Sequence, residues 1–469
     1  MGLLDLPTEI LKEIVEHVPF VVEDRWHMES CIKRGEWPPK SARTTLRRLC
    51  RTCHTLRAVA QPLLFRSLTL VKDTQKAGTM FVKYTESITQ CPELRKNAKM
   101  LNFYLGSESE FRGDREVWIP KRCDLSGLKQ AAPDFFASGK KRSMWMSGRT
   151  IKVDPHVLLL VSLLPKLQVL NLNAKQQRGD TGIARIGDMY KNLMELKELV
   201  LVASYGDLTP SDSLAPLLRL PHLTRLELKN FDIAGFYHKK MESSYDDKSL
   251  NIEKLAIKRC SMTNVIMERL IRACRRLTHF EYRAYREFGD KNHPEKNIDI
   301  ELWYAALSVH KDSLQEVCVN PVHEPEWAPE RHSLRELQPW PSFHEFLHLK
   351  ILKIEYRRML LTHLPPTLTY LYLFDSRFSP RDAEIDGWQA IKKDFCPDIE
   401  TVEIMFTEDC RSAQSTLKYR HFQWGCWTQK TREWRKGGFL LKVWFKDFID
   451  GTYHFSQVSG RHDRDRHMR

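Results

Sequence analysis

The fold is decided by the stretch Ile252-Glu253-Lys254-Leu255-Ala256-Ile257-Lys258-Arg259-Cys260. Its apolar residues stand at 252, 255 and 257, and a cysteine follows three residues later. The alternation of Leu255 and Ile257 with other residues predicts a short strand that buries one face. An apolar stretch of helical type, 267–274, ends at Arg275-Arg276 just before the next such strand. A unit built from a strand, a helix and a turn buries its apolar faces only against neighbouring units.

The same apolar triplet recurs along the chain at intervals of 19 to 37 residues. A triplet of this kind arises by chance on the order of ten times in a chain of this composition, so the spacing and the flanking helical stretches carry the argument. The copies begin at Leu167, Leu196, Leu223, Ile252, Leu277, Leu314, Leu349, Leu368 and Ile399. Degenerate earlier copies are Phe65, Leu68, Leu70 and Ala98, Leu101, Phe103.

This pattern resembles a leucine-rich repeat of the irregular kind, in which the length of the unit varies. The resemblance implies an α/β fold, in which a horseshoe-shaped solenoid carries parallel β-strands on its concave face. The sequence therefore predicts a repeat array over 67–410, with a polar surface insertion at 106–150. The aromatic and basic segment 411–469 is predicted to form a cap over the last repeat, followed by a basic tail.

The N-terminal residues predict two amphipathic helical segments that precede the array. In the first, apolar residues share one helical face, namely Leu6, Ile10, Leu11, Ile14, Val15 and Val18. Pro7 suits the first turn of a helix. A second stripe at steps of three and four comprises Leu46, Leu49, Cys50, Cys53 and Leu56. A helix pair this short cannot bury both stripes alone.

Three blocks in this region together resemble an F-box of the type common in fungal proteins. They are Leu6-Pro7-Thr8-Glu9-Ile10-Leu11, Leu49-Cys50-Arg51-Thr52-Cys53-His54-Thr55-Leu56-Arg57 and Gln61-Pro62-Leu63-Leu64-Phe65-Arg66-Ser67-Leu68-Thr69-Leu70. The resemblance covers 1–66 as a small all-α domain, and an insertion at 21–40 departs from the compact family pattern.

The F-box resemblance implies a function in protein–protein interaction. In that family the F-box binds a Skp adaptor, which tethers it to a cullin and so to an SCF-type ubiquitin ligase, while the rest of the chain selects the substrate. Catalysis then comes from other subunits, and we expect no enzyme activity in this chain. The residues expected to build the F-box and its adaptor-facing surface are Leu6, Pro7, Ile10, Leu11, Ile14, Leu49, Cys50 and Leu56.

Substrate-binding candidates lie on the predicted strands, at positions that alternate with the buried ones. Lys229, Lys258 and Arg283 follow three consecutive triplets and suggest a ladder for an acidic or phosphorylated substrate. Glu227 and Glu281 precede two of them on the same face, so a solvated charge network is the alternative. The aromatic candidates, which fit either a partner anchor or local core, are Tyr370, Tyr372 and Phe374.

Composition favours a folded protein of the cytoplasm or nucleus. The 469 residues are 42% hydrophobic and 29% charged, without an apolar run that suits a membrane span and without a secretory signal at the N-terminus. Eleven cysteines without framework spacing are expected to stay thiols. A net charge of +14 permits an acidic partner or nucleic acid without requiring either.

Other chemistries have weaker support in the sequence. Cys50-Arg51-Thr52-Cys53-His54 matches a haem-attachment motif but falls on the apolar stripe of the predicted F-box. Cys410, His421 and Cys426 form a loose cluster without the paired spacing of a zinc site. We expect neither a metal nor another cofactor. Two alternatives remain open: an F-box scaffold without a ligase role, and nucleic-acid binding by the aromatic and basic run that starts at Arg420.

Overall fold

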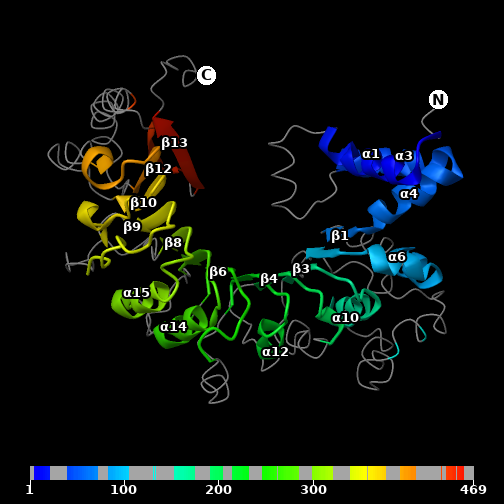
Figure 1. Cartoon of the computed structure of the whole chain (residues 1–469), viewed down its shortest axis with the longest axis horizontal. Coiled ribbons are helices and arrows are strands. Elements are labelled where there is room, and N and C mark those ends of the chain that lie inside the picture. The colour runs from blue at the N-terminus through cyan, green and yellow to red at the C-terminus, as the bar shows by residue number, and fades with distance from the viewer. Residues whose placement is uncertain are drawn as a thin grey trace. The chain divides into compact units, whose positions relative to one another are not determined.

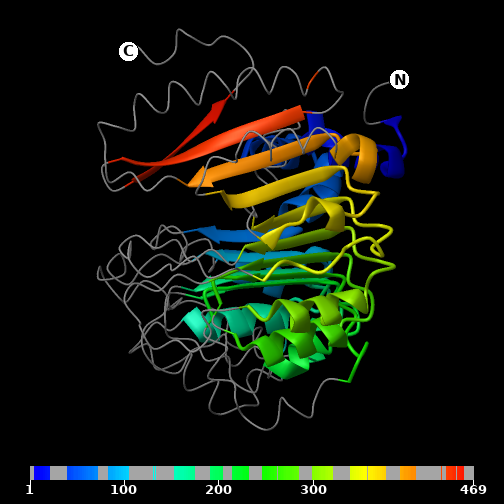
Figure 2. The same cartoon turned by 90° about the vertical axis from the view of Figure 1, so that its left-hand side faces the viewer.

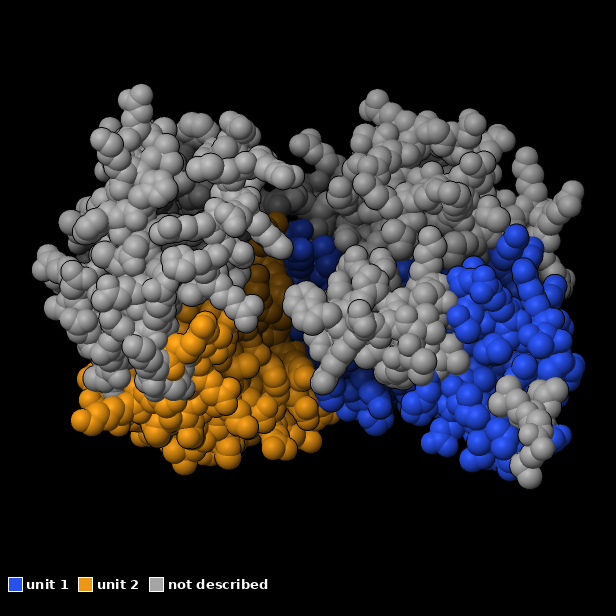
Figure 3. Space-filling model, turned by 90° about the horizontal axis from the view of Figure 1, so that it is seen from above, with its two compact units in different colours: residues 1–243 blue, residues 244–469 orange. Residues whose placement is uncertain are grey.

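The structure of the chain is a computed structural model, and it divides into two compact units, Met1–Ser243 and Ser244–Arg469 (Figure 3). Each unit is described by itself. The described residues are 5–21, 40–71, 83–104, 130, 133, 153–174, 191–203, 214–231, 246–260, 262–284, 298–320, 338–355, 358–376, 391–407, 435, 440–449 and 452–458.

The described part of unit 1 begins with the helices α1 (Thr8–Val21), α3 (Lys40–Thr52) and α4 (His54–Phe65), shown in blue in Figure 1. They pack around a common apolar core. Its buried members are Leu11, Val15, Leu46, Val59 and Ala60. The amphipathic helix predicted from the first apolar stripe is therefore confirmed.

The second predicted stripe does not lie on one helix. α3 ends at Thr52, and Cys53 has the extended backbone angles φ −156° and ψ 171°. The Cys53 Sγ accepts a hydrogen bond from the Leu56 backbone N–H at 3.5 Å, so this residue caps the start of α4. The prediction that these five residues share one helical stripe was wrong. The chain leaves the helical conformation at Cys53, and the side chain of this residue caps the start of a second helix.

The rest of unit 1 alternates short helices with parallel strands. In chain order these are β1 (Ser67–Val71), α6 (Pro92–Asn97), β2 (Met100–Tyr104), α10 (Val153–Leu163), β3 (Val169–Ala174), β4 (Glu198–Ala203), α12 (Leu214–Leu218) and β5 (Arg225–Lys229). Each strand from β1 to β5 pairs in parallel with the next. The register places one leucine of every strand in a single buried row, comprising Leu68, Leu101, Leu170, Leu199 and Leu226.

Unit 2 continues the same alternation. Its elements are β6 (Lys254–Lys258), α14 (Asn264–Ala273), β7 (His279–Arg283), α15 (Ile300–Ser308), β8 (Glu316–Asn320), β9 (Ile351–Glu355), η7 (Leu361–His363), β10 (Tyr370–Ser376), η8 (Ile391–Phe395), β11 (Thr401–Thr407), β12 (Leu440–Ile449) and β13 (Thr452–Val458). Strands β6 to β12 are parallel neighbours in chain order, and β13 is antiparallel to β12. Figure 2 shows the later strands of this unit stacked side by side.

Each of the nine predicted triplets contains a strand, β3 to β11, that starts two residues after the first apolar position. All three apolar residues of every triplet are buried. The two degenerate copies correspond to β1 and β2. The chain is thus a mixed α/β protein with parallel strands, as the repeat pattern predicted.

The segment 411–469 contributes the strands β12 and β13 to the sheet of unit 2. β12 lies in the segment 411–469, which was predicted to be a cap, and it pairs in parallel with β11. At the position that begins the triplet in the other repeats the sequence has Gly438, although Leu441 and Val443 follow the pattern. The insertions 21–40 and 106–150 lie almost entirely outside the described residues. No helix in the described part of the chain is long and apolar enough to cross a membrane.

Candidate interaction surfaces

An apolar stripe is exposed on α1 and on the residue just before it. Ile10 is 42% and Ile14 43% exposed, and Pro7 is exposed as well. Steps of three and four place these residues on one side of the helix. Leu11 and Val15, one position after each isoleucine, are only 1% and 3% exposed. The apolar sector of α1 is therefore wider than the face that the core covers. We call Pro7, Ile10 and Ile14 the α1 stripe.

The remaining residues predicted to form the adaptor surface point inward. Leu11 belongs to the core of the three helices, and Leu56 is buried. Leu6, Leu49 and Cys50 are half-buried and pack against that core. The sequence named the right helix without separating its exposed side chains from its buried ones. The number of apolar residues gave no signal, because six such positions in about four turns is the usual density of a core-facing stripe.

The described helices α14 and α15 of unit 2 lie on one side of its strands. Trp303 of α15 packs edge-on against Phe280 and Tyr282 of β7, with ring centroids 6.2 and 4.7 Å away. Because side chains alternate across a strand, His279, Glu281 and Arg283 point to the opposite face. Figures 1 and 2 show α14 and α15 together on one side of the neighbouring strands. We call the opposite side the outward strand face.

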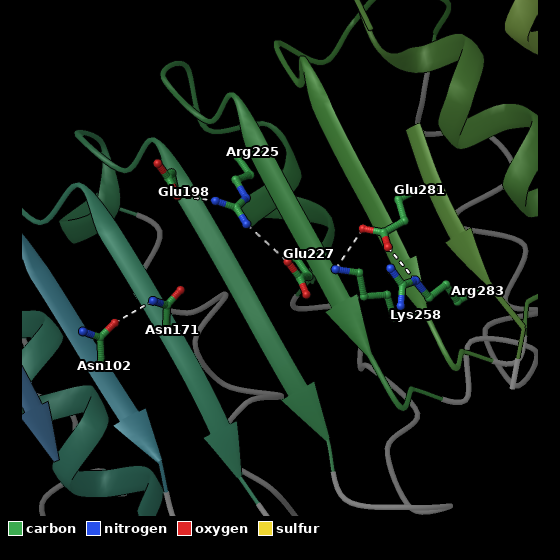
Figure 4. Close-up of polar contacts among 8 residues, drawn as sticks. All are labelled: Asn102, Asn171, Glu198, Arg225, Glu227, Lys258, Glu281 and Arg283. Carbon is green, nitrogen blue, oxygen red and sulfur yellow. Dashed lines mark hydrogen bonds and ion pairs between the residues drawn. The ribbon is translucent and has the colours of Figure 1, made fainter. Parts of the chain in front are cut away.

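Glu281 organises the β6–β7 end of this face (Figure 4). Its carboxylate binds Lys258 Nζ at 2.9 Å and Arg283 Nε at 2.6 Å. Partial burial alone would raise the pKa of Glu281, but the two cations outweigh it and the pKa is lowered. Lys229, the third member of the predicted ladder, belongs to unit 1. The charge network that the sequence left as an alternative therefore exists at Lys258 and Arg283, with two cations on one carboxylate.

A second network lies further along the outward strand face. Tyr370 of β10 donates a hydrogen bond to Glu403 of β11, whose other oxygen binds Lys442 Nζ of β12 at 2.7 Å. Lys353 Nζ of β9 lies 2.6 Å from the Glu316 carboxylate of β8 and 5.9 Å from the centre of the Tyr370 ring. Burial and the nearby Glu403 carboxylate raise the pKa of Tyr370. Each of these contacts joins side chains of different strands.

The aromatic candidates adjoin these charges. Tyr372 and Phe374 are perpendicular neighbours, with centroids 4.6 Å apart. Phe374 is buried at 8% exposure, while Tyr372 is half-buried and interacts electrostatically with Arg283. The Arg283 side chain itself remains 56% exposed. This end of the face thus presents an exposed guanidinium group beside a half-buried phenol.

The sequence missed four of the charged residues on this face: Glu316, Lys353, Glu403 and Lys442. Each occupies the first or the middle outward position of its strand, whereas the predicted basic ladder was taken from the position after each triplet. Alternation along a strand applies to every second residue, so the earlier positions carried the missing signal.

The corresponding face of unit 1 has different chemistry. The Asn102 amide donates to Thr69 Oγ1 at 3.1 Å, and the Asn171 amide donates to Asn102 Oδ1 at 2.6 Å (Figure 4). Neighbouring strands place these residues in register. Towards β5, Arg225 binds Glu198 at 3.2 Å and Glu227 at 3.4 Å. Neutral amides therefore occupy the first strands, and ion pairs the later ones.

The two cysteines of the haem-like motif both have roles in helix packing. Cys50 packs against the three-helix core, and burial raises the pKa of its thiol despite the nearby Arg57 guanidinium. Cys53 caps α4. Among the described residues, no three His, Cys, Asp or Glu side chains form a group that could hold a metal ion. Cys410, His421 and Cys426 lie outside that part of the chain, as does the aromatic run that starts at Arg420.

No protein-family model matches this chain, and a search of curated proteins found no relative.

Proposed function

We propose that the chain is the substrate-recognition subunit of an SCF-type ubiquitin ligase. In this proposal α1, α3 and α4 form an F-box that binds a Skp-type adaptor and, through it, a cullin. The strands and helices from β1 onward are leucine-rich repeats, and the outward strand face of unit 2 binds the target protein.

The observation that carries the proposal is the exposure of the α1 stripe. A small three-helix module has few apolar residues to spare, yet it leaves two isoleucines more than 40% exposed on one side of a helix. Exposed apolar residues gathered on one helix face mark a protein interaction site more often than isolated ones do. The family resemblance of Leu6-Pro7-Thr8-Glu9-Ile10-Leu11 supplies the kind of partner.

The double variant Ile10→Glu, Ile14→Glu should bind a Skp-type adaptor about 30- to 100-fold more weakly than wild type. Each substitution places a charged carboxylate in an apolar contact. The measurement is isothermal titration calorimetry with the purified adaptor. The thermal midpoint should stay within about 2 °C of the wild type, since neither side chain belongs to the core.

The matched control is Glu9→Gln with Glu16→Gln, an exposed and a half-buried position on another side of the same helix. It should leave the affinity within about twofold. An adaptor that binds the wild type and the double-glutamate variant equally well would contradict the proposal. So would a wild-type chain that fails to bind any Skp-type adaptor.

The target is proposed to bind around Arg283 and Tyr372. The Nε of Arg283 is fixed by Glu281, which orients the guanidinium group while more than half of the side chain stays exposed. Tyr372 contributes an aromatic ring whose edge-on partner is Phe374. Arginine and tyrosine held in this way are typical of the residues that dominate protein interfaces.

The double variant Arg283→Ala, Tyr372→Ala should lose its target while it keeps the adaptor. The measurement is quantitative mass spectrometry of the proteins retained from a lysate by wild type and variant, with the adaptor as internal standard. We expect target recovery to fall at least about tenfold, because two anchor side chains are lost. The control Arg275→Ala, Arg276→Ala changes two exposed residues in the turn after α14 and should keep both partners. Unchanged recovery of every retained protein would exclude this face.

A further inference from the structure

α3 carries an unusual concentration of positive charge. Its sequence, Lys-Ser-Ala-Arg-Thr-Thr-Leu-Arg-Arg-Leu-Cys-Arg-Thr, contains five basic residues and no acidic one. The following helix, α4, also contains no acidic residue. The net charge of the whole chain, +14 over 469 residues, does not account for such a local excess.

The charges lie on the side of α3 that faces away from the core. Leu46 is buried, and Leu49 and Cys50 are half-buried against the three-helix core. Arg47 and Arg51 are exposed and one helical turn apart, and Arg48 is exposed beside them. In the described part of the chain no carboxylate forms an ion pair with these three residues.

A fourth arginine joins them from α4. The Arg57 Nε donates a hydrogen bond to the Cys50 backbone carbonyl at 2.9 Å, which ties this exposed side chain to the last turn of α3. Its guanidinium group therefore adds to the charge of the α3 surface. We call Arg47, Arg48, Arg51 and Arg57 the arginine patch.

This arrangement costs the helix stability. Like charges three or four positions apart repel, and Arg47 with Arg51 and Arg48 with Arg51 are two such pairs. Acidic residues are available in the same module, since Glu9 and Glu13 on α1 are exposed. Among the described residues of the module no carboxylate forms an ion pair with the patch, so an acidic surface of another molecule fits it by charge.

We infer that the arginine patch binds a carboxylate-rich segment of the protein that covers the α1 stripe. This inference rests on the proposed function and adds to it the chemistry of the partner: the adaptor must present aspartates or glutamates to α3 and α4. Guanidinium groups bind carboxylates through paired hydrogen bonds, which suits four arginines without a lysine among them. A protein partner is favoured over nucleic acid because the same module exposes an apolar stripe, and interfaces between proteins combine an apolar centre with a charged rim.

The patch acts mainly on the rate of association. Charges at the rim of an interface accelerate the encounter of the two molecules and contribute less to the lifetime of the complex. Their effect decreases with ionic strength, because salt screens exposed charges beyond about 10 Å at 0.1 M.

The test is the triple variant Arg47→Glu, Arg48→Glu, Arg51→Glu, measured against the purified Skp-type adaptor by surface plasmon resonance. At about 50 mM salt the association rate should fall by about 10- to 100-fold relative to wild type, and at about 500 mM the difference should shrink to a few-fold. The dissociation rate should change by less than about fivefold. The milder variant Arg47→Gln, Arg48→Gln, Arg51→Gln keeps the helix free of new charges and should give an intermediate rate.

The matched control changes net charge by the same amount elsewhere in unit 1. Lys83→Glu, Lys166→Glu, Lys191→Glu alters three exposed lysines and should lower the association rate by no more than about twofold. If the arginine variant behaves like this control while the wild type binds the adaptor, the inference is wrong and the proposed function stands. If the arginine variant instead no longer binds a short oligonucleotide that the wild type binds, while its adaptor binding is unchanged, the patch binds nucleic acid. That result also overturns the inference.

Discussion

Replacing Trp303 with alanine should lower the free energy of unfolding of unit 2 by about 3–5 kcal/mol, the usual cost of removing a large buried aromatic side chain. Trp303 is 2% exposed and fills the space between α15 and β7. Its edge contacts with Phe280 and Tyr282 contribute to stability beyond the buried area. Hydrogen–deuterium exchange of peptides from β7 and β8, followed in increasing urea, would measure the change.

Trp303→Phe serves as the matched control. It keeps an aromatic ring in place, and it removes an indole N–H for which the described residues offer no hydrogen-bond partner. Because an unpaired buried donor costs about 1–3 kcal/mol, its removal offsets part of the lost packing. We expect a loss of less than about 2 kcal/mol. Equal losses for the phenylalanine and alanine variants would contradict the packing described for this site.

Unit 2 should also lose stability as the pH falls below about 6.5, because His310 is buried as a neutral ring. Its Nε2–H donates to the Ile271 carbonyl at 2.9 Å, and its Nδ1 accepts from the Leu277 backbone N–H at 3.4 Å. Burial lowers the pKa of His310, and the nearby Lys248 acts in the same direction. The unfolded chain therefore takes up a proton at a higher pH than the folded chain does. The stabilisation that neutral His310 provides is fully present above the pKa that this residue has in the unfolded chain. It declines as the pH falls towards the lower pKa of His310 in the folded chain.

His310→Ala should cost about 3 kcal/mol at pH 7.5, because it leaves a cavity and removes the partner of two buried backbone groups. His310→Gln keeps a neutral polar side chain and should flatten the slope of stability between pH 5 and 7. Urea unfolding at several pH values, followed by the same exchange peptides, measures both effects. A wild-type slope that persists in the glutamine variant would assign the pH dependence to another group.

Much of the fold could be predicted from the sequence because its rule is local. In each repeat the residues at positions such as Leu277, Phe280 and Tyr282 must be apolar to be buried, and every such triplet from Leu167 to Ile399 contains a strand. β12 was not predicted because Gly438 stands where the other repeats begin with an apolar residue. The break between α3 and α4 at Cys53 was not predicted either. The apolar residues keep their helical spacing across it, so the sequence pattern does not show that the backbone is extended at this residue.

The candidate sites were predictable only in part, because exposure and pairing depend on neighbours distant in sequence. Ile10 and Leu11 look equivalent in an apolar stripe, and only the packing of α3 and α4 separates them. Likewise, Lys258 and Arg283 were visible as cations on one face, but their sharing of Glu281 depends on the register between β6 and β7.

The parallel register of unit 2 gives the outward strand face a regular spacing of side chains. Neighbouring strands lie about 4.8 Å apart, so the outward positions from β6 to β12 repeat at regular steps over roughly 29 Å. The inward residues that fix this spacing are separate from the outward ones. Substitution of one outward side chain therefore changes the surface at its own strand and, through the ion pairs, at the strands beside it. Under the proposed function, specificity can evolve by changes in such small groups of outward residues, without any need to redesign the core.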